Sequence, residues 1–385
     1  MGAIRQCSNP MLILYTFPNM KYFFVLLLLI ILPFSICNAQ NSKFDLDDFY
    51  TVNPKLDRAV DSIFNALTDK QKVAQMIISC TGELGKPEAI VKKLTEDDII
   101  GGVVFLKGSK KTHTETIDEL NAISKKNKTL PLIFSMDAEP SLFASRIKGA
   151  QDVGKTIDIK TKSKSDSVVT IINRELKEIG VHHNFAPVLD ISPSNEAIKS
   201  RSYGNNKDSV INLANRFIKC TQEGGIIATA KHFPGHGLVK GDTHKQSVYI
   251  DGPLQEVDNY IPIIADGVLS IMIAHITVVN NDVFGTNGLP SSCSRRIITD
   301  LLKDGMCFDG IVISDALNIM KAVTILDNAP LLASKAGCDM ILMPQDEKKT
   351  MNSILEEIKI NEGYKTQVTE SVKKILRLKL CAGMI

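Results

Sequence analysis

Eight short apolar runs place the strongest constraint on how this chain can fold. Each run is followed by a polar stretch long enough to form a helix that leads back to the next strand. The runs cover residues 73–80, 101–106, 130–136, 181–191, 226–230, 269–278, 308–313 and 338–343. Eight such units predict an α/β protein with a single (β/α)8 TIM-type barrel. An open doubly wound sheet is the alternative, and it is disfavoured because no glycine-rich dinucleotide-binding turn follows the first run.

The composition fits one globular domain and argues against a nucleic-acid partner. Apolar residues make up 44% of the 385-residue chain, which is ample for the core of one barrel. The formal net charge is +2, and the chain has no basic stripe with interleaved aromatic residues. We therefore expect a small-molecule or glycan ligand rather than DNA or RNA.

The first forty residues have the layout of a secretory signal. Lys21 precedes an apolar run at 22–32, which is short for a membrane span of about 20 residues, and modest side chains lead up to Ala39. The pattern predicts a signal peptide at residues 1–39 and a mature barrel at residues 40–385. We expect this mature chain to be exported, periplasmic or secreted, and to have no membrane span.

Two details of this N-terminal segment are separate predictions. Met20 is predicted to be the start of translation, because the stretch before it has no signal features of its own. Lipid attachment at Cys37 is an alternative to simple cleavage, although residues 34–36 match a lipoprotein cleavage box poorly.

Six cysteines follow the predicted cleavage point. Their spacing forms no compact disulfide framework and no CxxC pair, and several lie inside apolar runs. We therefore predict buried, unpaired thiols for Cys80, Cys220, Cys293, Cys307, Cys338 and Cys381.

The stretch after the fifth run carries an unusual set of ionisable residues. Residues 231–237 read KHFPGHG, and Asp242, Thr243 and His244 follow. Pro234 and the glycines around it predict an irregular loop. This loop would begin at the carboxyl end of a buried strand, where parallel barrels place their chemistry.

Further acids and bases follow other predicted strands. They are Asp137, Glu139, Asp190, His275 and Asp315. One polar residue after a strand is usually a helix cap. Five of them at the same end of one barrel instead indicate a functional site.

Several motifs together resemble glycoside hydrolase family 3, and in particular its NagZ-like β-N-acetylhexosaminidases. Besides KHFPGHG with Asp242 and His244, they are GIVISD at 310–315, NFAPVLD at 184–190 and RSYG at 201–204. AGCDM at 336–340 and LPSS at 289–292 also fall in the family's order. The resemblance spans roughly residues 60–383.

The resemblance implies a retaining exo-β-N-acetylhexosaminidase with a covalent glycosyl-enzyme intermediate and no cofactor or metal. Its nucleophile would be Asp315, and its proton donor would be His244, oriented by Asp242. A carboxylate on one imidazole nitrogen can aim the other nitrogen at the glycosidic oxygen. Glu139 is the next candidate for the donor. The implied substrates end in β-linked N-acetylglucosamine, as in peptidoglycan fragments or related glycans.

The resemblance also implies which residues bind the sugar. Asp137, Arg201, Lys231 and His232 match family positions that hydrogen-bond the sugar hydroxyls and the acetamido group. His236 is expected to brace its loop through a backbone hydrogen bond instead.

One segment departs from the family pattern. Residues 137–143 read DAEPSLF, whereas relatives carry DQEGGRV, so both glycines and the first arginine are missing. Pro140 is expected to stiffen this turn. Arg146 matches a later family arginine only if the register shifts by one residue. The departure leaves the substrate and the activity open.

Three alternatives to the retaining hydrolase therefore remain. A non-catalytic glycan-binding barrel would account for the altered segment. A zinc-dependent hydrolase could use His232, His236, His244 and Asp315, although His232 and His236 flank Pro and Gly and cannot share one helical face. The third is a phosphorylase with the same covalent intermediate, or a β-glycoside hydrolase, of other specificity.

Overall fold

The computed structural model describes residues 43–191, 195–240 and 248–385. The predicted signal segment 1–39, with Met20 and Cys37, lies outside the described residues. Asp242, Thr243 and His244 also lie outside them. The description that follows therefore concerns the barrel domain alone.

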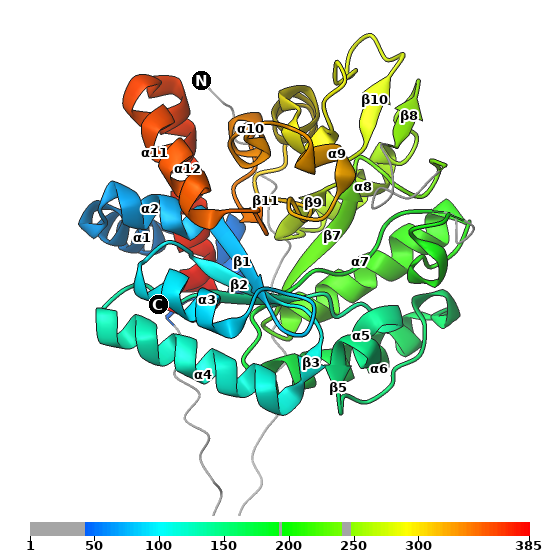
Figure 1. Cartoon of the computed structure of the whole chain (residues 1–385). Helices are drawn as coiled ribbons and strands as arrows, with labels where there is room; N and C mark the ends of the chain where they lie inside the picture. The colour runs from blue at the N-terminus through cyan, green and yellow to red at the C-terminus, as the bar shows by residue number, and fades with distance from the viewer. Residues whose placement is uncertain (1–42, 192–194, 241–247) are drawn as a thin grey trace, which may run out of the picture. The chain divides into compact units, whose positions relative to one another are not determined.

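Eight parallel strands form the centre of this domain (Figure 1). Their order in the sheet is β11-β9-β7-β6-β4-β2-β1-β12, and a parallel bridge between Ile313 and Met340 joins the two edges into a barrel. The strands are β1 (Ile77–Thr81), β2 (Gly102–Phe105), β4 (Ile133–Met136), β6 (His183–Asn184), β7 (Ile227–Phe233), β9 (Ser270–Ile273), β11 (Ile311–Ser314) and β12 (Ile341–Leu342). Each predicted apolar run contains one of them. The predicted (β/α)8 barrel is confirmed.

The bounds of the runs and of the strands do not coincide, and three runs differ from their strands in ways that affect the fold. The first run includes the end of helix α2 (Asp69–Met76), so β1 begins only at Ile77. In the run 181–191 only two residues pair as a strand, and the Ala186-Pro187 peptide bond within it is cis. The run 269–278 contains two strands, β9 and the short β10 (Thr277–Val279).

Strand β7 is longer than predicted. It extends to Phe233, so Lys231 and His232 belong to the strand and not to an irregular loop. The pairing with β9 shifts register between Ala230 and Phe233 and then resumes at Ile273. Pro234 ends the ladder because it has no N–H to donate, but it does not prevent pairing of the residues before it.

Two small parallel pairs lie beside the barrel. β8 (Tyr249–Asp251) pairs with β10, and β3 (Gly108–Ser109) pairs with β5 (Ile147–Lys148).

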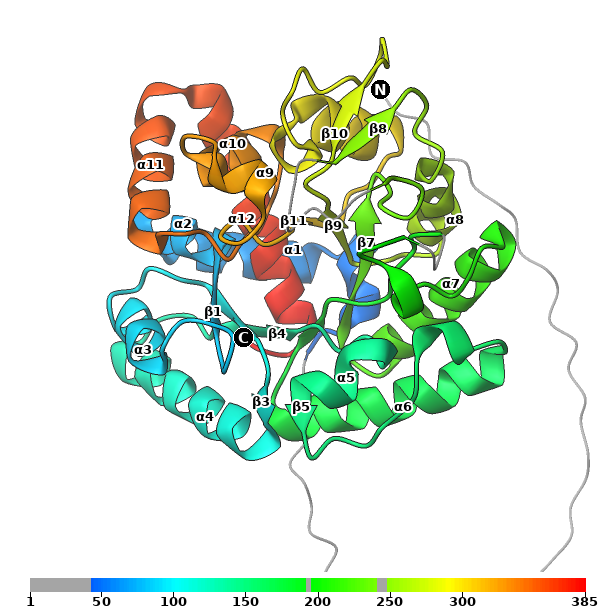
Figure 2. The ribbon, with the colours of Figure 1, turned by 45° about the vertical axis from the view of Figure 1, so that its right-hand side comes forward.

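The long helices cover the outside of the barrel (Figures 1 and 2). Helix α6 (Lys162–Ile179) is typical: the Thr161 hydroxyl accepts a hydrogen bond from Lys164 N at 3.2 Å, and Gly180 ends the helix with a φ of 94°. The other helices are α1 (Pro54–Ala66), α3 (Glu88–Glu96), α4 (Lys110–Asn127), α5 (Pro140–Arg146), α7 (Lys207–Glu223), α8 (Tyr260–Ala265), α9 (Lys321–Thr324), α10 (Ala329–Ala336), α11 (Glu347–Ile360), α12 (Glu362–Cys381) and a π-helix (Arg296–Gly305).

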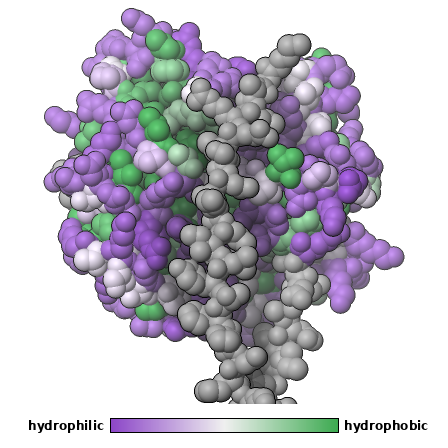
Figure 3. Space-filling view, turned by 180° about the vertical axis from the view of Figure 1, so that it is seen from behind, coloured by the Kyte–Doolittle hydropathy of each residue, from purple (hydrophilic) through white to green (hydrophobic). Residues whose placement is uncertain are grey.

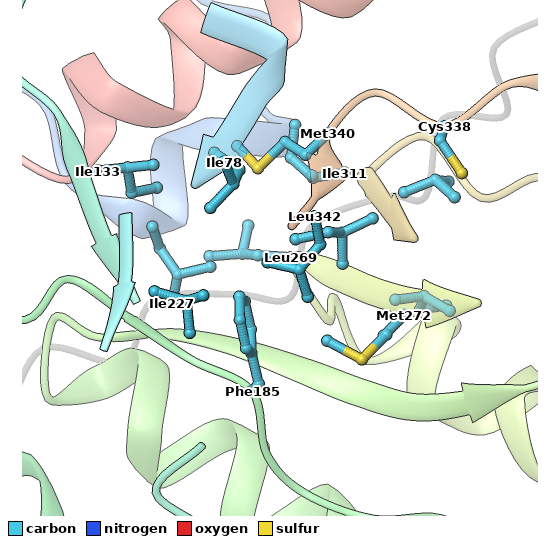
Figure 4. Close-up of a cluster of buried hydrophobic side chains, with 14 of the residues drawn as sticks. Ile78, Ile133, Phe185, Ile227, Leu269, Met272, Ile311, Cys338, Met340 and Leu342 are labelled. Atoms are coloured by element: carbon cyan, nitrogen blue, oxygen red, sulfur yellow. The ribbon is translucent and has the colours of Figure 1, made fainter. Parts of the chain in front are cut away.

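Branched aliphatic side chains fill the barrel interior. Ile78, Ile227 and Leu342 come from strands far apart in the sequence and meet Phe185, which directly follows β6, in one cluster (Figure 4). All four are buried. Such packing holds the strands rigid, so the residues at their ends have well-defined positions.

Side chains on the face seen from behind are mostly hydrophilic (Figure 3). Among the described residues, no helix has both the length and the apolar character needed to cross a bilayer. The six cysteines in this part of the chain are all free, as predicted. Four of them are buried, but the prediction of burial is wrong for Cys307, which is exposed, and Cys220 is only half-buried.

Candidate active site

A cavity of ≈ 450 Å³ opens at the carboxyl ends of the barrel strands. Asp137, Arg201, Lys231, His232 and Asp315 all line it. The structure thus brings together the predicted nucleophile and the four predicted sugar-binding residues, whereas Glu139, Asp190 and His275 do not line the cavity. A larger depression of ≈ 790 Å³ lies between outer helices and contains none of these residues.

Two cations and two carboxylates form one network on the cavity wall. Lys231 Nζ lies 2.7 Å from Asp137 Oδ1 and 2.6 Å from Glu139 Oε1. The Arg201 guanidinium also binds Glu139, with Nε to Oε2 at 2.8 Å and Nη2 to Oε1 at 2.7 Å. This two-pronged geometry fixes the position and the angle of the arginine.

Glu139 supports the site but is not suited to donate a proton. Burial alone would raise its pKa, but the charges of Arg201 and Lys231 hold the pKa of this carboxyl well below its usual range. A group that stays ionised has no proton to give near neutral pH. The expectation that Glu139 is the second candidate for the donor is therefore not supported.

Asp190 orients His232. Its Oδ2 lies 2.7 Å from His232 Nδ1, and its Oδ1 accepts the His236 N–H at 2.8 Å. Burial would raise the pKa of Asp190, and the neighbouring His232 lowers it below the ordinary value. The bond to Nδ1 leaves Nε2 of His232 as the ring atom available to a ligand in the cavity.

Asp315 follows β11 and lies on the cavity wall. Its Oδ1 accepts the Ala316 N–H at 2.7 Å, and its own N–H binds Ile273 O at 3.0 Å. Burial raises the pKa of this carboxyl, but the neighbouring imidazoles of His275 and His232 hold the pKa below its ordinary value. Asp315 is therefore a carboxylate near neutral pH, as a nucleophile requires.

His275 has a supporting position. Its Nδ1 lies 2.6 Å from Ser292 Oγ, and its Nε2 lies 3.0 Å from Ala316 O. Burial lowers the pKa of His275. It holds the backbone next to Asp315.

A residue that the sequence analysis missed, Glu256, anchors the chain after β7. Its Oε1 accepts Ile191 N at 2.6 Å, and its Oε2 accepts Gly237 N at 2.9 Å and Leu238 N at 3.1 Å. Gly237 must be glycine, because a Cβ there would lie 1.6 Å from Ile191 O. Glu256 follows no predicted strand, so no pattern in the sequence marks it.

The backbone of His236 is held on both sides, as expected for a bracing residue. Its N–H binds Asp190, and its carbonyl accepts a bond from Asn195 Nδ2 at 2.9 Å. The same amide nitrogen binds Val239 O at 2.7 Å. Residues 231–240 are thus fixed up to the point where the described segment ends.

The altered segment 137–143 leads into helix α5 and forms its first turn. Pro140 is the first residue of α5, a position that needs no N–H donor. Ser141 Oγ binds Ser200 O at 2.7 Å, which ties α5 to the turn that carries Arg201. Leu142 and Arg146 from the same helix line the cavity.

The imidazoles and carboxylates do not gather as metal ligands in the described part of the chain. No group of three or more His, Cys, Asp or Glu side chains there could hold a metal ion. His244, the third histidine of the zinc alternative, lies outside the described residues.

Comparison with known proteins decides the family. Residues 68–378 match the sequence model of the glycosyl hydrolase family 3 N-terminal domain. The chain belongs to glycoside hydrolase family 3. This match confirms the resemblance read from the motifs.

Relatives in family 3 carry related names. The chain is 26% identical over 309 residues to a "Beta-N-acetylglucosaminidase/beta-glucosidase" of Cellulomonas fimi, covering 76% of this chain and 54% of the relative. A "Beta-hexosaminidase" of Actinobacillus pleuropneumoniae is 27% identical, with 72% and 82% covered. The chain therefore spans about half the length of the Cellulomonas fimi relative.

Solved structures of family 3 proteins share the fold. A family 3 β-N-acetylglucosaminidase from Paenibacillus sp. str. FPU-7 superposes with a TM-score of 0.75 at 28% identity. The superposition covers 83% of this chain and 63% of that one.

Proposed function

We propose that this family 3 chain is a retaining exo-β-N-acetylhexosaminidase. The observation that carries the proposal is the placement of Asp315, an ionised carboxylate, in the same cavity as the network of Asp137, Arg201 and Lys231. A retaining glycosidase needs such a carboxylate beside a set of polar groups that hold the sugar. The names of the relatives point to N-acetylhexosaminides as the substrates.

The first chemical step forms a glycosyl-enzyme. An Asp315 oxygen attacks the anomeric carbon while the bond from that carbon to the glycosidic oxygen breaks, and His244 gives its proton to the departing oxygen. In the second step water attacks the same carbon, gives a proton to His244 and releases Asp315. Asp242 orients the imidazole in both steps.

The network on the wall binds the sugar in this proposal. Asp137 and His232 present an acceptor and a ring nitrogen to the sugar hydroxyls, and Arg201 and Lys231 present N–H donors. Buried hydrogen-bonding groups of this kind discriminate strongly against ligands that lack the matching hydroxyl.

The natural substrates are proposed to be peptidoglycan fragments or related glycans that end in β-linked N-acetylglucosamine. Export through the segment 1–39 would bring the enzyme to such glycans.

A panel of aryl β-glycosides assayed with the mature chain, residues 40–385, tests the function. We expect turnover of the N-acetylglucosaminide in preference to the glucoside. A fluorosugar inactivator that slows the second step should label Asp315, and Asp315→Ala should abolish turnover while the protein stays folded. Labelling of another residue, or wild-type rates for the variant, would contradict the assignment.

The same panel separates the alternatives. A non-catalytic glycan-binding barrel would bind the sugar in an equilibrium titration without releasing the aryl group. A phosphorylase would give sugar 1-phosphate when phosphate is present.

A further inference from the structure

The wall of the active-site cavity has a polar part and an apolar part. Asp137, Arg201, Lys231 and His232 come from or after β4, β6 and β7, which are neighbours in the barrel. The strands β11, β12, β1 and β2 are also neighbours, because the Ile313–Met340 bridge closes the ring. Leu142, Phe185, Ala197 and Ile198 lie among the polar groups, so that part of the lining is mixed. Asp315 is the one charged lining residue from β11, β12, β1, β2 and the segments after them, and the other lining residues there are apolar. The large ones form what we call the apolar wall, which consists of Leu84, Leu106, Ile319, Met320, Leu342 and Met343.

Two members of the apolar wall are exposed. The exposed fractions are 61% for Leu84 and 52% for Ile319, whereas Met320 and Met343 are buried. A single exposed aliphatic residue on a protein surface is ordinary. Here the exposed residues continue into the buried ones along one cavity, so a ligand in the cavity would cover them.

The apolar wall offers no side-chain hydrogen bonds to a sugar. Leucine and isoleucine have no polar side-chain atom, and the methionine sulfur is a weak acceptor. A sugar ring placed there would leave its hydroxyls unpaired, which costs free energy. The sugar is better matched to the part of the cavity that holds Asp137 and Lys231.

We propose that the apolar wall binds the aglycone, and that it favours an alkyl or aryl aglycone over the second sugar of a glycan. The inference rests on the proposed function, because it assumes that the sugar occupies the polar part. An exo-acting enzyme holds the terminal sugar deepest, so the group attached to the sugar lies toward the opening, where Leu84 and Ile319 are exposed. The acetamido methyl group of the sugar could also contact apolar residues. The apolar wall, to which four strands contribute, is larger than this single methyl group requires.

The test measures kcat/KM for methyl, butyl and hexyl β-N-acetylglucosaminides below their micelle concentrations. Full burial of one methylene corresponds to about a fourfold gain, so we expect a rise of roughly two- to fourfold for each methylene. Leu84→Ser and Ile319→Ser should each reduce the ratio of the hexyl to the methyl value. Ile325→Ser is the matched control, because Ile325 is 68% exposed and is not among the residues that line the cavity.

Two results would overturn the proposal. One is a kcat/KM that does not change with alkyl length. The other is a dependence on the length of the N-acyl group, compared as N-acetyl and N-butyryl sugars, without any dependence on the aglycone, since the wall would then hold the acyl group.

Failure of the proposed function can be told apart from failure of this inference. If no glycoside is hydrolysed, the same three alkyl glycosides are titrated against the protein by calorimetry. Affinity that rises with alkyl length and falls in Leu84→Ser supports the apolar wall, and equal affinities contradict it.

Discussion

The Arg201 guanidinium binds both carboxylate oxygens of Glu139, at 2.8 and 2.7 Å. Lys231 reaches the same carboxylate at 2.6 Å. Glu139 is 1% exposed and does not line the cavity, whereas Arg201 and Lys231 do. Glu139 therefore contacts the two cations from the side that faces away from the cavity. The orientation of both cations toward a sugar depends on a group that the sugar does not touch.

Replacing Glu139 with glutamine should therefore cost stability and weaken sugar binding. Loss of one partner of a buried ion pair typically costs about 3–5 kcal/mol, because the other charge stays buried without compensation. Denaturant unfolding measures the cost, and KM for an aryl glycoside reports on the sugar site. Glu83→Gln is the control: Glu83 pairs with Lys148 at the surface, where such pairs are worth about 0–1 kcal/mol. Equal losses in the two variants would contradict the supporting role of Glu139.

The low pKa of Glu139 predicts that the free energy of unfolding depends on pH. The folded pKa of Glu139 lies below the unfolded value of about 4.3, so the unfolded chain binds more protons as the solution becomes acid. The stabilisation by Glu139 is complete above that value and is lost as the pH falls through the folded pKa. Glu139→Gln should show a smaller loss of stability in acid than the wild type, when both are measured by denaturant unfolding from pH 7 to pH 3.

His244→Ala should harm substrates with poor leaving groups most. A nitrophenolate departs with little help from a proton, whereas the leaving sugar of a disaccharide needs one, and general acid catalysis contributes roughly 10²–10⁴-fold. Rates of hydrolysis of both substrates by both proteins give the comparison. Asp242→Asn should fall between wild type and His244→Ala. Equal losses on both substrates would mean that His244 has no role as the proton donor.

Glu256→Gln should lower kcat by displacing the start of the segment after β7. The two oxygens of the Glu256 carboxyl group accept three backbone N–H groups. The amide of glutamine has one oxygen, so its NH2 group would face at least one of these N–H donors. An unsatisfied buried donor costs about 1–3 kcal/mol. Asp258→Asn removes an exposed carboxylate two residues away and is the control. A wild-type kcat in a folded Glu256→Gln protein would show that this anchoring does not affect catalysis.

Lys379 gives a prediction at the opposite end of the barrel. Burial lowers the pKa of this lysine to about 7, and its Nζ binds Gln75 Oε1 at 2.7 Å, Gly101 O at 3.1 Å and Pro131 O at 2.7 Å. Between that pKa and the unfolded value of about 10.4, the unfolded chain binds more protons, so stability rises with pH. The slope is at most about 1.4 kcal/mol per pH unit.

Lys379→Met removes this slope. Denaturant unfolding of wild type and variant between pH 7 and pH 10 should show that the difference in unfolding free energy grows with pH in favour of the wild type. A constant difference would indicate that the three acceptors keep the ammonium group charged over the whole range, because three acceptors match its three N–H groups.

The predictions from sequence succeeded where they depended on strand order. Asp137, Lys231 and Asp315 each lie at the end of an apolar run, and all three line the cavity. The prediction was wrong for the residues just before Pro234, where the rule that proline disrupts regular structure was applied to its neighbours. Pro234 was expected to make Lys231 and His232 irregular, yet pairing with β9 continues the strand to Phe233.

The barrel can be predicted from the sequence alone, because eight apolar runs separated by helical stretches leave few ways to bury them, and parallel strands put the residues that follow them at one end. The protonation and the partners of those residues depend on contacts made in the folded chain. Glu139 and Arg201 are 62 residues apart, and Glu256 lies 65 residues from Ile191. The pKa of Glu139 and the anchoring by Glu256 follow from contacts between segments that no local pattern relates, since charge interactions and burial depend on distance in space.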